Sequence, residues 1–434
     1  MRARLIGNGL LTARVSDDVA ALLDALQLQG ASMDRLLALD DTRWRELLRY
    51  CDDMCLTLPL ALRSYEQFPA WVCNRLRTNL ADTAQRFPLV QAAYCEASAA
   101  LAEAGVPFLV IKGFAQSPDF AKAPQFRMQG DIDFYVPREK AVRAVKALEA
   151  IGYEGAGPEE DFQKADHHPT LIRWGNWKWR ENRFDPELPP ALEVHHCLWN
   201  AAVYLIPLPE IDEFWNRRVD RKLGDFSFPA LSAVDHFGYF SLHVLREMLS
   251  GGRALHNALE LATFIHGRAD DAAFWTEWQG LHSPRLRQVE SIPAALASAA
   301  FSSRLPDALR EQIDRLPAEQ RAWIESCGGD MLAASFGRTR DGRLLQFMLS
   351  ESPRTRRKIL WRALLPGAIA SPRRVGTRSG YPGGPRPGPV RLLWKYAAYV
   401  TSCSFFHGTA ILRLVATGLR LWLSSFALRR AVRS

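Results

Sequence analysis

The segment 130–135, which reads Gly-Asp-Ile-Asp-Phe-Tyr, constrains the fold of this chain more than any other. Its alternation of polar and apolar residues predicts a β-strand, because residues two apart on a strand point to the same side. Asp131 and Asp133 would then project side by side, while Ile132 and Phe134 enter an apolar layer. Adjacent carboxylates repel each other unless a cation lies between them, and Mg²⁺ commonly serves as that cation. The segment therefore predicts a divalent-metal site on an α/β core.

Short apolar runs predict the other strands of this core. They lie at 107–111, 170–174 and 192–197, and the strand with the two aspartates extends over 128–136. Apolar spacing over 141–148 predicts a helix that ends at a glycine. We expect these elements to form a compact α/β unit with a small mixed sheet over residues 96–205.

Helical apolar spacing flanks the core on both sides. It predicts a mainly helical region over residues 1–95 and a helical domain over residues 206–350. The predicted fold class is therefore α+β. Residues 366–389 contain six Gly, six Pro and four Arg, a composition typical of a linker.

Charge is distributed unevenly along the chain. The net charge is +8, yet residues 1–351 contain 39 basic and 47 acidic residues, whereas residues 352–434 contain sixteen basic residues and no acidic one. This asymmetry indicates that the tail is attracted to a nucleic acid or to an anionic membrane surface. Nucleic acid is the disfavoured partner, because the part that contains the core is acidic.

Residues 390–434 predict basic amphipathic helices. The run 396–412 has seventeen residues without a formal charge if its histidine is neutral, which is the lower limit for spanning a bilayer. Arginines interrupt the apolar residues that follow. This pattern favours helices that lie on the membrane surface over helices that cross it.

Cysteine usage and the N-terminal segment bear on the compartment. The seven cysteines are scattered and lack the paired spacing of a structural zinc site. Gly7, Asn8 and Gly9 interrupt the first apolar stretch before the core of a signal peptide can form. We expect a cytoplasmic protein that reaches the inner face of the membrane through its tail.

A later strand offers a third carboxylate. Alternation places Glu193 and His195 on one face, so Glu193 can join Asp131 and Asp133 if the two strands are neighbours. Three carboxylates around Mg²⁺ or Mn²⁺ ions suit phosphoryl transfer, in which the metal activates a hydroxyl and neutralises a triphosphate. Glu193 would lie on the attacking side, where it is a candidate base.

The phosphates of a nucleotide require hydrogen-bond donors as well. Lys112 and Gly113 follow the first strand, where a lysine and exposed backbone amides at a helix start would bind phosphate. Arg127, four residues before Asp131, is a second candidate. These three residues form the predicted nucleotide-binding set.

The motifs in this order resemble the uncharacterised nucleotidyltransferase family of the polymerase-beta-like superfamily. The matching segments are 110–114, 127–136, 152–153, 167–168 and 193–195, and the resemblance extends over roughly residues 85–350. It implies a nucleotidyltransferase fold in which Asp131, Asp133 and Glu193 bind metal. Lys112-Gly113 differs from the Gly-Ser or Gly-Gly of better-known transferases. Bacterial members of the family are associated with exopolysaccharide and capsule pathways, so the resemblance also suggests a role in cell-envelope polysaccharide biosynthesis.

Two histidine pairs, 167–168 and 195–196, are alternative metal ligands. Neighbouring residues on a strand point to opposite faces, so only one member of each pair can join a site. We expect His168 and His195 to support the carboxylates rather than to bind metal. Asp235-His236 has the reverse order of the His-Asp pair in metal phosphohydrolases, so we do not expect that chemistry.

Three functions compete at this stage. The first is transfer of a nucleoside monophosphate from a nucleoside triphosphate to an unidentified hydroxyl acceptor. The second is a non-catalytic accessory protein that binds nucleotide at the membrane surface. The third is a nucleic-acid polymerase or terminal transferase, which the acidic charge of residues 1–351 disfavours.

Overall fold

The computed structural model describes most of the chain up to residue 364 and parts of the tail. The described residues are 15–63, 65–155, 166–175, 177–178, 180–250, 252–333, 341–364, 393–394, 396–398, 400–401 and 407–419. The predicted linker over 366–389 and much of the predicted tail over 390–434 lie outside the described residues.

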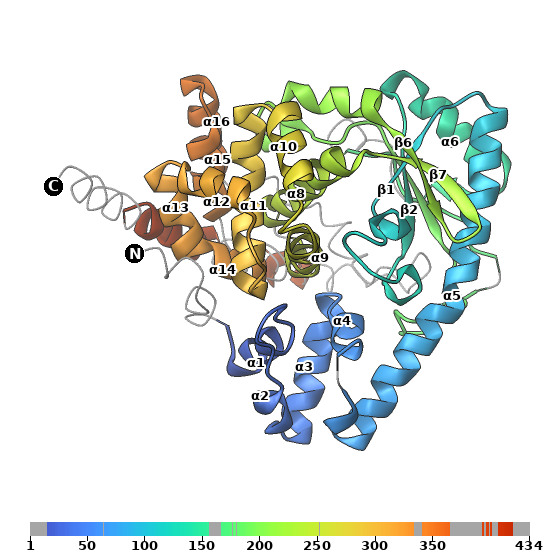
Figure 1. Cartoon of the computed structure of the whole chain (residues 1–434), viewed down its shortest axis with the longest axis horizontal. Coiled ribbons are helices and arrows are strands. Elements are labelled where there is room, and N and C mark those ends of the chain that lie inside the picture. The colour runs from blue at the N-terminus through green and yellow to red at the C-terminus, as the bar shows by residue number, and fades with distance from the viewer. Residues whose placement is uncertain are drawn as a thin grey trace.

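Helices make up the larger part of the described structure, and Figure 1 shows their arrangement. The α-helices are α1 (Asp17–Ala25), α2 (Asp34–Leu37), α3 (Asp41–Asp53), α4 (Thr57–Ala61), α5 (Ala70–Glu103), α6 (Ala141–Ala150), α7 (Ala201–Tyr204), α8 (Ala233–Ser250), α9 (Ala254–Gly267), α10 (Ala272–Leu281), α11 (Pro284–Phe301), α12 (Asp307–Asp314), α13 (Ala318–Trp323), α14 (Gly329–Ala333), α15 (Asp341–Leu349) and α16 (Pro353–Leu364). Short 3₁₀ segments are η2 (Tyr65–Gln67), η3 (Gly113–Gln116), η4 (Pro124–Phe126), η5 (Arg138–Lys140) and η7 (Pro209–Arg217), and η8 (Ile324–Gly328) is a π-helix.

A small mixed sheet lies at the centre of the core. Its strands are β1 (Leu109–Ile111), β2 (Asp131–Tyr135), β3 (Glu154–Gly155), β4 (Leu171–Ile172) and β5 (Ala191–His195), in the order β1-β2-β5-β4-β3. The pair β2 and β5 is parallel, and the remaining pairs are antiparallel. The predicted fold class, α+β with a small mixed sheet and helical flanks, is confirmed.

One part of the sequence interpretation was wrong. The region after residue 205 was expected to be helical, but β6 (Val219–Leu223) and β7 (Phe226–Ala230) form an antiparallel hairpin. Its two-residue turn contains Gly224, whose φ of +59° suits a tight hairpin connection. The apolar side chains of Phe228 and Ala230 join the core cluster of the sheet.

The long helix α5 connects the N-terminal helices to the sheet, as Figure 1 shows. Tyr94 of α5 packs against Phe114, with ring centroids 5.3 Å apart, and stacks on Phe134 of β2 at 6.2 Å. Ile132 and Phe134 are fully buried in this cluster. The apolar face of β2 is therefore fixed against α5, which directs its aspartates to the other face.

A buried ionic network joins η7, α8, the end of α10 and α11. Nδ1 of His282 lies 2.8 Å from Oε1 of Glu290, and its Nε2 lies 3.2 Å from Oδ1 of Asp235. Arg217 donates two hydrogen bonds to Asp235 at 2.9 and 2.7 Å. Burial alone would lower the pKa of His282, but the two carboxylates raise it from 6.5 to about 9.

The raised pKa of His282 predicts a pH-dependent stability. The charged imidazole stabilises the folded state fully below pH 6.5, and this contribution, roughly 3 kcal/mol, disappears as the pH rises through about 9. We expect His282→Gln to lower the thermal unfolding midpoint more at pH 6 than at pH 9.5. Melting curves of both proteins at the two pH values test this, and an equal difference at both would contradict it.

Candidate functional site

The register of two strands brings the predicted carboxylates together. In the parallel pair β2 and β5, Asp133 lies opposite Glu193 and Asp131 lies opposite Ala191. Asp133 is buried, with 2% of its surface exposed. Ligand atoms of Asp133, Glu193 and His195 lie within 4.8 Å of one another, which makes this the one compact group of metal-ligand side chains in the described part of the chain.

His195 holds the two carboxylates in place. Its Nε2 lies 2.8 Å from Oδ1 of Asp133 and 3.3 Å from Oε2 of Glu193. Burial and the charge of Lys112 lower the pKa of His195, but hydrogen bonds to the two carboxylates outweigh them and raise it. The two carboxylates therefore favour the protonated form of His195, whose ring lies between Asp133 and Glu193.

Lys112 supplies a second cation to the same carboxylate. Its Nζ forms an ion pair with Oδ1 of Asp133. The lysine has a φ of +63°, which is rare for a residue with a side chain and marks a constrained turn after β1. Burial would lower the pKa of Lys112, but the charge of Asp133 raises it, so the ammonium group stays charged.

Gly113 allows the chain to pass closely behind the first aspartate. Its φ is +56°, and a Cβ at this position would lie 2.3 Å from Nε2 of Gln129. That amide donates a hydrogen bond of 2.9 Å to the carbonyl oxygen of Asp131. The glycine thus makes room for the side chain that braces the start of β2. Gly113 begins the single 3₁₀ turn η3, whose residues are buried, rather than an α-helix with exposed amides.

Arg127 forms an ion pair with a glutamate of the helical domain. Its guanidinium forms a bidentate pair with Glu260 of α9, at 2.6 and 3.1 Å. Bidentate pairs of this kind fix the position of the arginine. The structure therefore places Arg127 as a link between the start of β2 and α9, and its role in phosphate binding stays a prediction.

The charge balance of the site suits a divalent cation. Burial, together with repulsion from Asp133 and Glu193, raises the pKa of Asp131 to about 7. A bound cation would relieve this repulsion. Carboxylate oxygens are the ligands that Mg²⁺ and Mn²⁺ prefer, and the compact group of Asp133, Glu193 and His195 could hold a metal ion. Asp131 is not part of this compact group, so its predicted role as a metal ligand stays a prediction.

The segment 166–170 adds side chains that the sequence interpretation did not assign to the site. Thr170 donates a hydrogen bond of 3.0 Å to Oε1 of Glu193, and Nε2 of His167 lies 4.0 Å from Oε2 of Glu193. His168 points elsewhere, since its ring packs edge-on against His196 at 6.1 Å. Of this histidine pair, His167 lies at the carboxylates and His168 does not.

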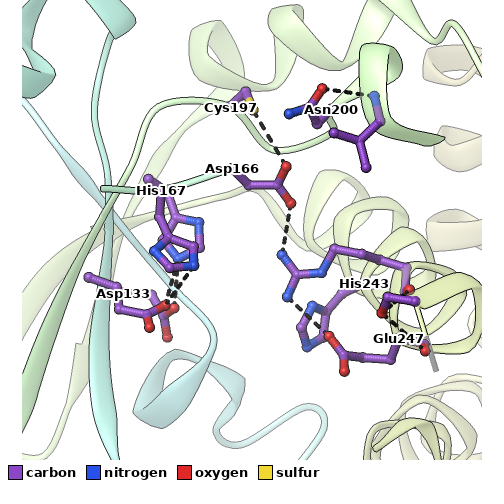
Figure 2. A network of polar contacts seen from close by, with 12 residues as sticks. Asp133, Asp166, His167, Cys197, Asn200, His243 and Glu247 are labelled. Atoms are coloured by element: carbon purple, nitrogen blue, oxygen red, sulfur yellow. Dashed lines mark hydrogen bonds and ion pairs between the residues drawn. The ribbon is translucent and has the colours of Figure 1, made fainter. Parts of the chain in front are cut away.

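Helix α8 also turns a polar face toward this region. Figure 2 shows Asp166 between the carboxylate cluster and α8, and Arg246 of α8 donates a hydrogen bond of 3.1 Å to it. Tyr239 lies about two helical turns before Arg246 on α8. Its ring stacks on the ring of His243, with centroids 6.3 Å apart. Among the described residues, the Tyr239 hydroxyl is buried without a hydrogen-bond partner. The sequence predicted that these residues lie on a helix, but it did not indicate that this helix lies close to the carboxylates.

The bracing role of Gly113 leads to a testable expectation. Gly113→Ala should displace Gln129 and strain the backbone at positive φ, which would lower stability by about 1 kcal/mol or more and disturb Asp131. Gly130→Ala is the matched control, because its Cβ would have no neighbour within 4 Å. Thermal unfolding and Mn²⁺ titration compare the two variants. Equal behaviour of both would show that Gly113 has no bracing role.

Comparison with known proteins gives one match. The model of a family described as uncharacterised nucleotidyltransferase matches residues 40–301, which is more than half of the chain. No curated protein matches, and no solved structure matches. The matched range contains the whole sheet and each of the predicted site residues. The chain therefore belongs to this uncharacterised nucleotidyltransferase family.

Proposed function

We propose that the protein transfers a nucleoside monophosphate from a nucleoside triphosphate to a hydroxyl acceptor, with Mg²⁺ or Mn²⁺. The observation that carries the proposal is the parallel register of Asp133 with Glu193, with Asp131 two residues earlier on the same strand. Family membership supports the same reaction class. The assignment of individual roles to these residues is part of the proposal.

In this reaction the acceptor oxygen attacks the α-phosphorus, and the bond from that phosphorus to the bridging oxygen of the β-phosphate breaks. Pyrophosphate leaves with the bonding electron pair. Asp131, Asp133 and Glu193 would hold the metal, which lowers the pKa of the acceptor hydroxyl and neutralises phosphate charge. Glu193 receives the hydroxyl proton and passes it to solvent, and the ammonium group of Lys112 donates hydrogen bonds to phosphate oxygens.

A second candidate is a nucleotide-binding accessory protein without turnover. The observation in its favour is that Lys112 and His195 both already contact Oδ1 of Asp133. Two protein cations on one carboxylate oxygen can satisfy it without a catalytic metal. The two candidates agree on nucleotide binding and differ in whether a product forms.

The first experiment tests nucleotide binding. Asp131→Asn combined with Asp133→Asn should weaken Mg²⁺-dependent binding of nucleoside triphosphates at least about 100-fold, because the metal loses two charged ligands. Asp220→Asn with Asp225→Asn, at two exposed positions of the hairpin of β6 and β7, is the matched control. Isothermal titration calorimetry measures both. Unchanged affinity in the Asp131 and Asp133 variant would remove the proposal.

An activity assay separates the two candidates. The full chain is incubated with α-labelled nucleoside triphosphates, Mg²⁺ and cell extract, and the products are separated by chromatography. Transfer of label by the wild type, but not by the variant of Asp131 and Asp133, supports the enzyme. Retained nucleotide binding without transfer supports the accessory protein.

We further propose that the C-terminal part of the chain lies on an anionic membrane surface. Helix α16 exposes Trp361, 63% accessible, together with Leu360 and Leu364. Exposed basic residues of the same helix are Arg354, Arg356, Arg357 and Lys358. Exposed Trp and Leu with neighbouring cations are typical of helices that bind the interface of anionic membranes. No helix in the described residues is long and apolar enough to cross a membrane.

The helical stretch 407–419 adjoins the end of α16, since Nε2 of His407 lies 3.0 Å from the carbonyl oxygen of Leu364. Arg413 anchors it to the helical domain through Asp330 at 2.8 Å and Asp341 at 3.0 Å. Leu412 and Val415 remain exposed, at 72% and 61%. Apolar side chains on a fixed surface are costly unless something covers them. A role in cell-envelope polysaccharide biosynthesis, which would fit such a location, stays a prediction.

Vesicle binding tests the membrane proposal. Trp361→Ala should weaken binding to vesicles that contain phosphatidylglycerol by about tenfold, because one large apolar side chain no longer enters the interface. Trp174→Ala is the control, because Trp174 belongs to the α/β unit and its side chain is 45% exposed. Co-sedimentation with anionic and with neutral vesicles measures the effect. Equal binding by both variants would contradict a role for this surface.

A further inference from the structure

A cavity is lined in part by Arg127, which precedes Asp131 by four residues. It has a volume of about 470 Å³ and is lined by residues near α4, by the segment 120–128 and by α9. Figure 1 shows α4 close to α9, where the N-terminal helices meet the rest of the molecule. The volume lies within the range of sites that bind small organic molecules.

The walls of the cavity are predominantly apolar. They include Leu26, Leu28, Pro59, Phe120, Phe126 and Leu259. These side chains come from the N-terminal region, the core and the helical domain. A ligand in this cavity would therefore have an apolar body, and its binding would bring three parts of the chain into contact with one molecule.

The floor of the cavity contains one ion pair, whose positive and negative charges balance each other. Glu260 is 5% exposed and receives the bidentate hydrogen bonds of Arg127. Nε2 of His256 lies 3.5 Å from Oε1 of Glu260. Burial lowers the pKa of His256, which favours the neutral ring, and the charges of Arg127 and Glu260 balance each other. The floor does not by itself select a charged ligand.

The remaining charged residues of the lining are both basic. Lys122 is exposed, and Arg63 is half-buried and donates hydrogen bonds to the carbonyl oxygens of Leu26 and Gln27. Within the described residues, neither Lys122 nor Arg63 forms an ion pair. Two uncompensated cations beside an apolar cavity are complementary to a ligand that combines an apolar body with an anionic group.

Some residues that line the cavity are close in sequence to the carboxylates of β2. Met128 belongs to its lining and precedes Asp131 by three residues, a separation of about 10 Å in an extended chain. Arg127 also lines the cavity, where it pairs with Glu260, and it interacts electrostatically with Asp131 and Asp133. A molecule that fills the cavity would thus have one end close to the proposed site of transfer.

We propose that this cavity binds an amphipathic organic anion, with its apolar body between α4 and α9 and its anionic group at Lys122 and Arg63. We assign this anion the role of the hydroxyl acceptor, an assignment that rests on the proposed function. The proposal thereby names the chemical class of the second substrate. Binding of the anion to this cavity does not depend on the proposed metal ligands.

Calorimetry with a defined probe tests the binding. Decyl phosphate, below its micellar concentration, is titrated into the full chain without nucleotide or metal. We expect Leu259→Trp, which fills the cavity, and Lys122→Glu, which reverses a charge, each to weaken binding about tenfold or more. Decanol, which has the same chain without the anion, should also bind about tenfold more weakly than decyl phosphate.

Matched controls make this result specific. Leu89→Trp places the same side chain at an exposed position of α5, and Lys146→Glu makes the same charge change on the surface of α6. Both should bind decyl phosphate like the wild type. Because Lys122 is exposed, Lys122→Glu should fold even if Leu259→Trp does not. Equal affinity of Lys122→Glu and Lys146→Glu, or no binding by the wild type, would overturn the proposal.

The role as acceptor site has a separate readout. Leu259→Trp should keep Mg²⁺-dependent nucleotide binding and lose transfer of label to the acceptor in cell extract. Transfer that continues unchanged in this variant would refute the acceptor role. If the wild type transfers no label but binds decyl phosphate, the proposed transferase activity fails while the anion site stands.

Discussion

The parallel pairing of β2 with β5 is the interaction on which the site depends. It places Asp133 opposite Glu193, and a shift of one residue would turn Glu193 to the apolar face of the sheet. The register is held on that apolar face, where Ile132 and Phe134 are fully buried beneath α5. The hydrophobic core therefore fixes the geometry of the carboxylates, although none of its side chains takes part in the chemistry.

Much of the core was predictable because its signals are local. Alternation along 130–135 located β2 and the common face of its aspartates, and short apolar runs located β1, β4 and β5. The hairpin of β6 and β7 was missed because its short alternating strands lie directly before the long helical pattern of α8. The Gly224 turn was the one signal that could have revealed it.

The contacts between distant segments could not be predicted. Arg127 and Glu260 are 133 residues apart, and nothing in a single sequence links an arginine before one strand to a glutamate in a later helix. The same holds for Lys112, whose predicted role at phosphate gave no indication of its ion pair with Asp133. Both residues were identified as important by their type and position, but their partners depend on how the helical domain packs on the sheet.

The two cations on Asp133 connect stability to chemistry. Buried carboxylates that repel each other would destabilise a fold without metal, and the ion pair with Lys112 and the hydrogen bond from His195 offset that repulsion. A metal that binds Oδ1 of Asp133 would therefore compete with Lys112 for this oxygen atom. In the proposed reaction this competition is useful, because the ammonium group released from Asp133 becomes free to donate to the phosphate oxygens that arrive with the metal.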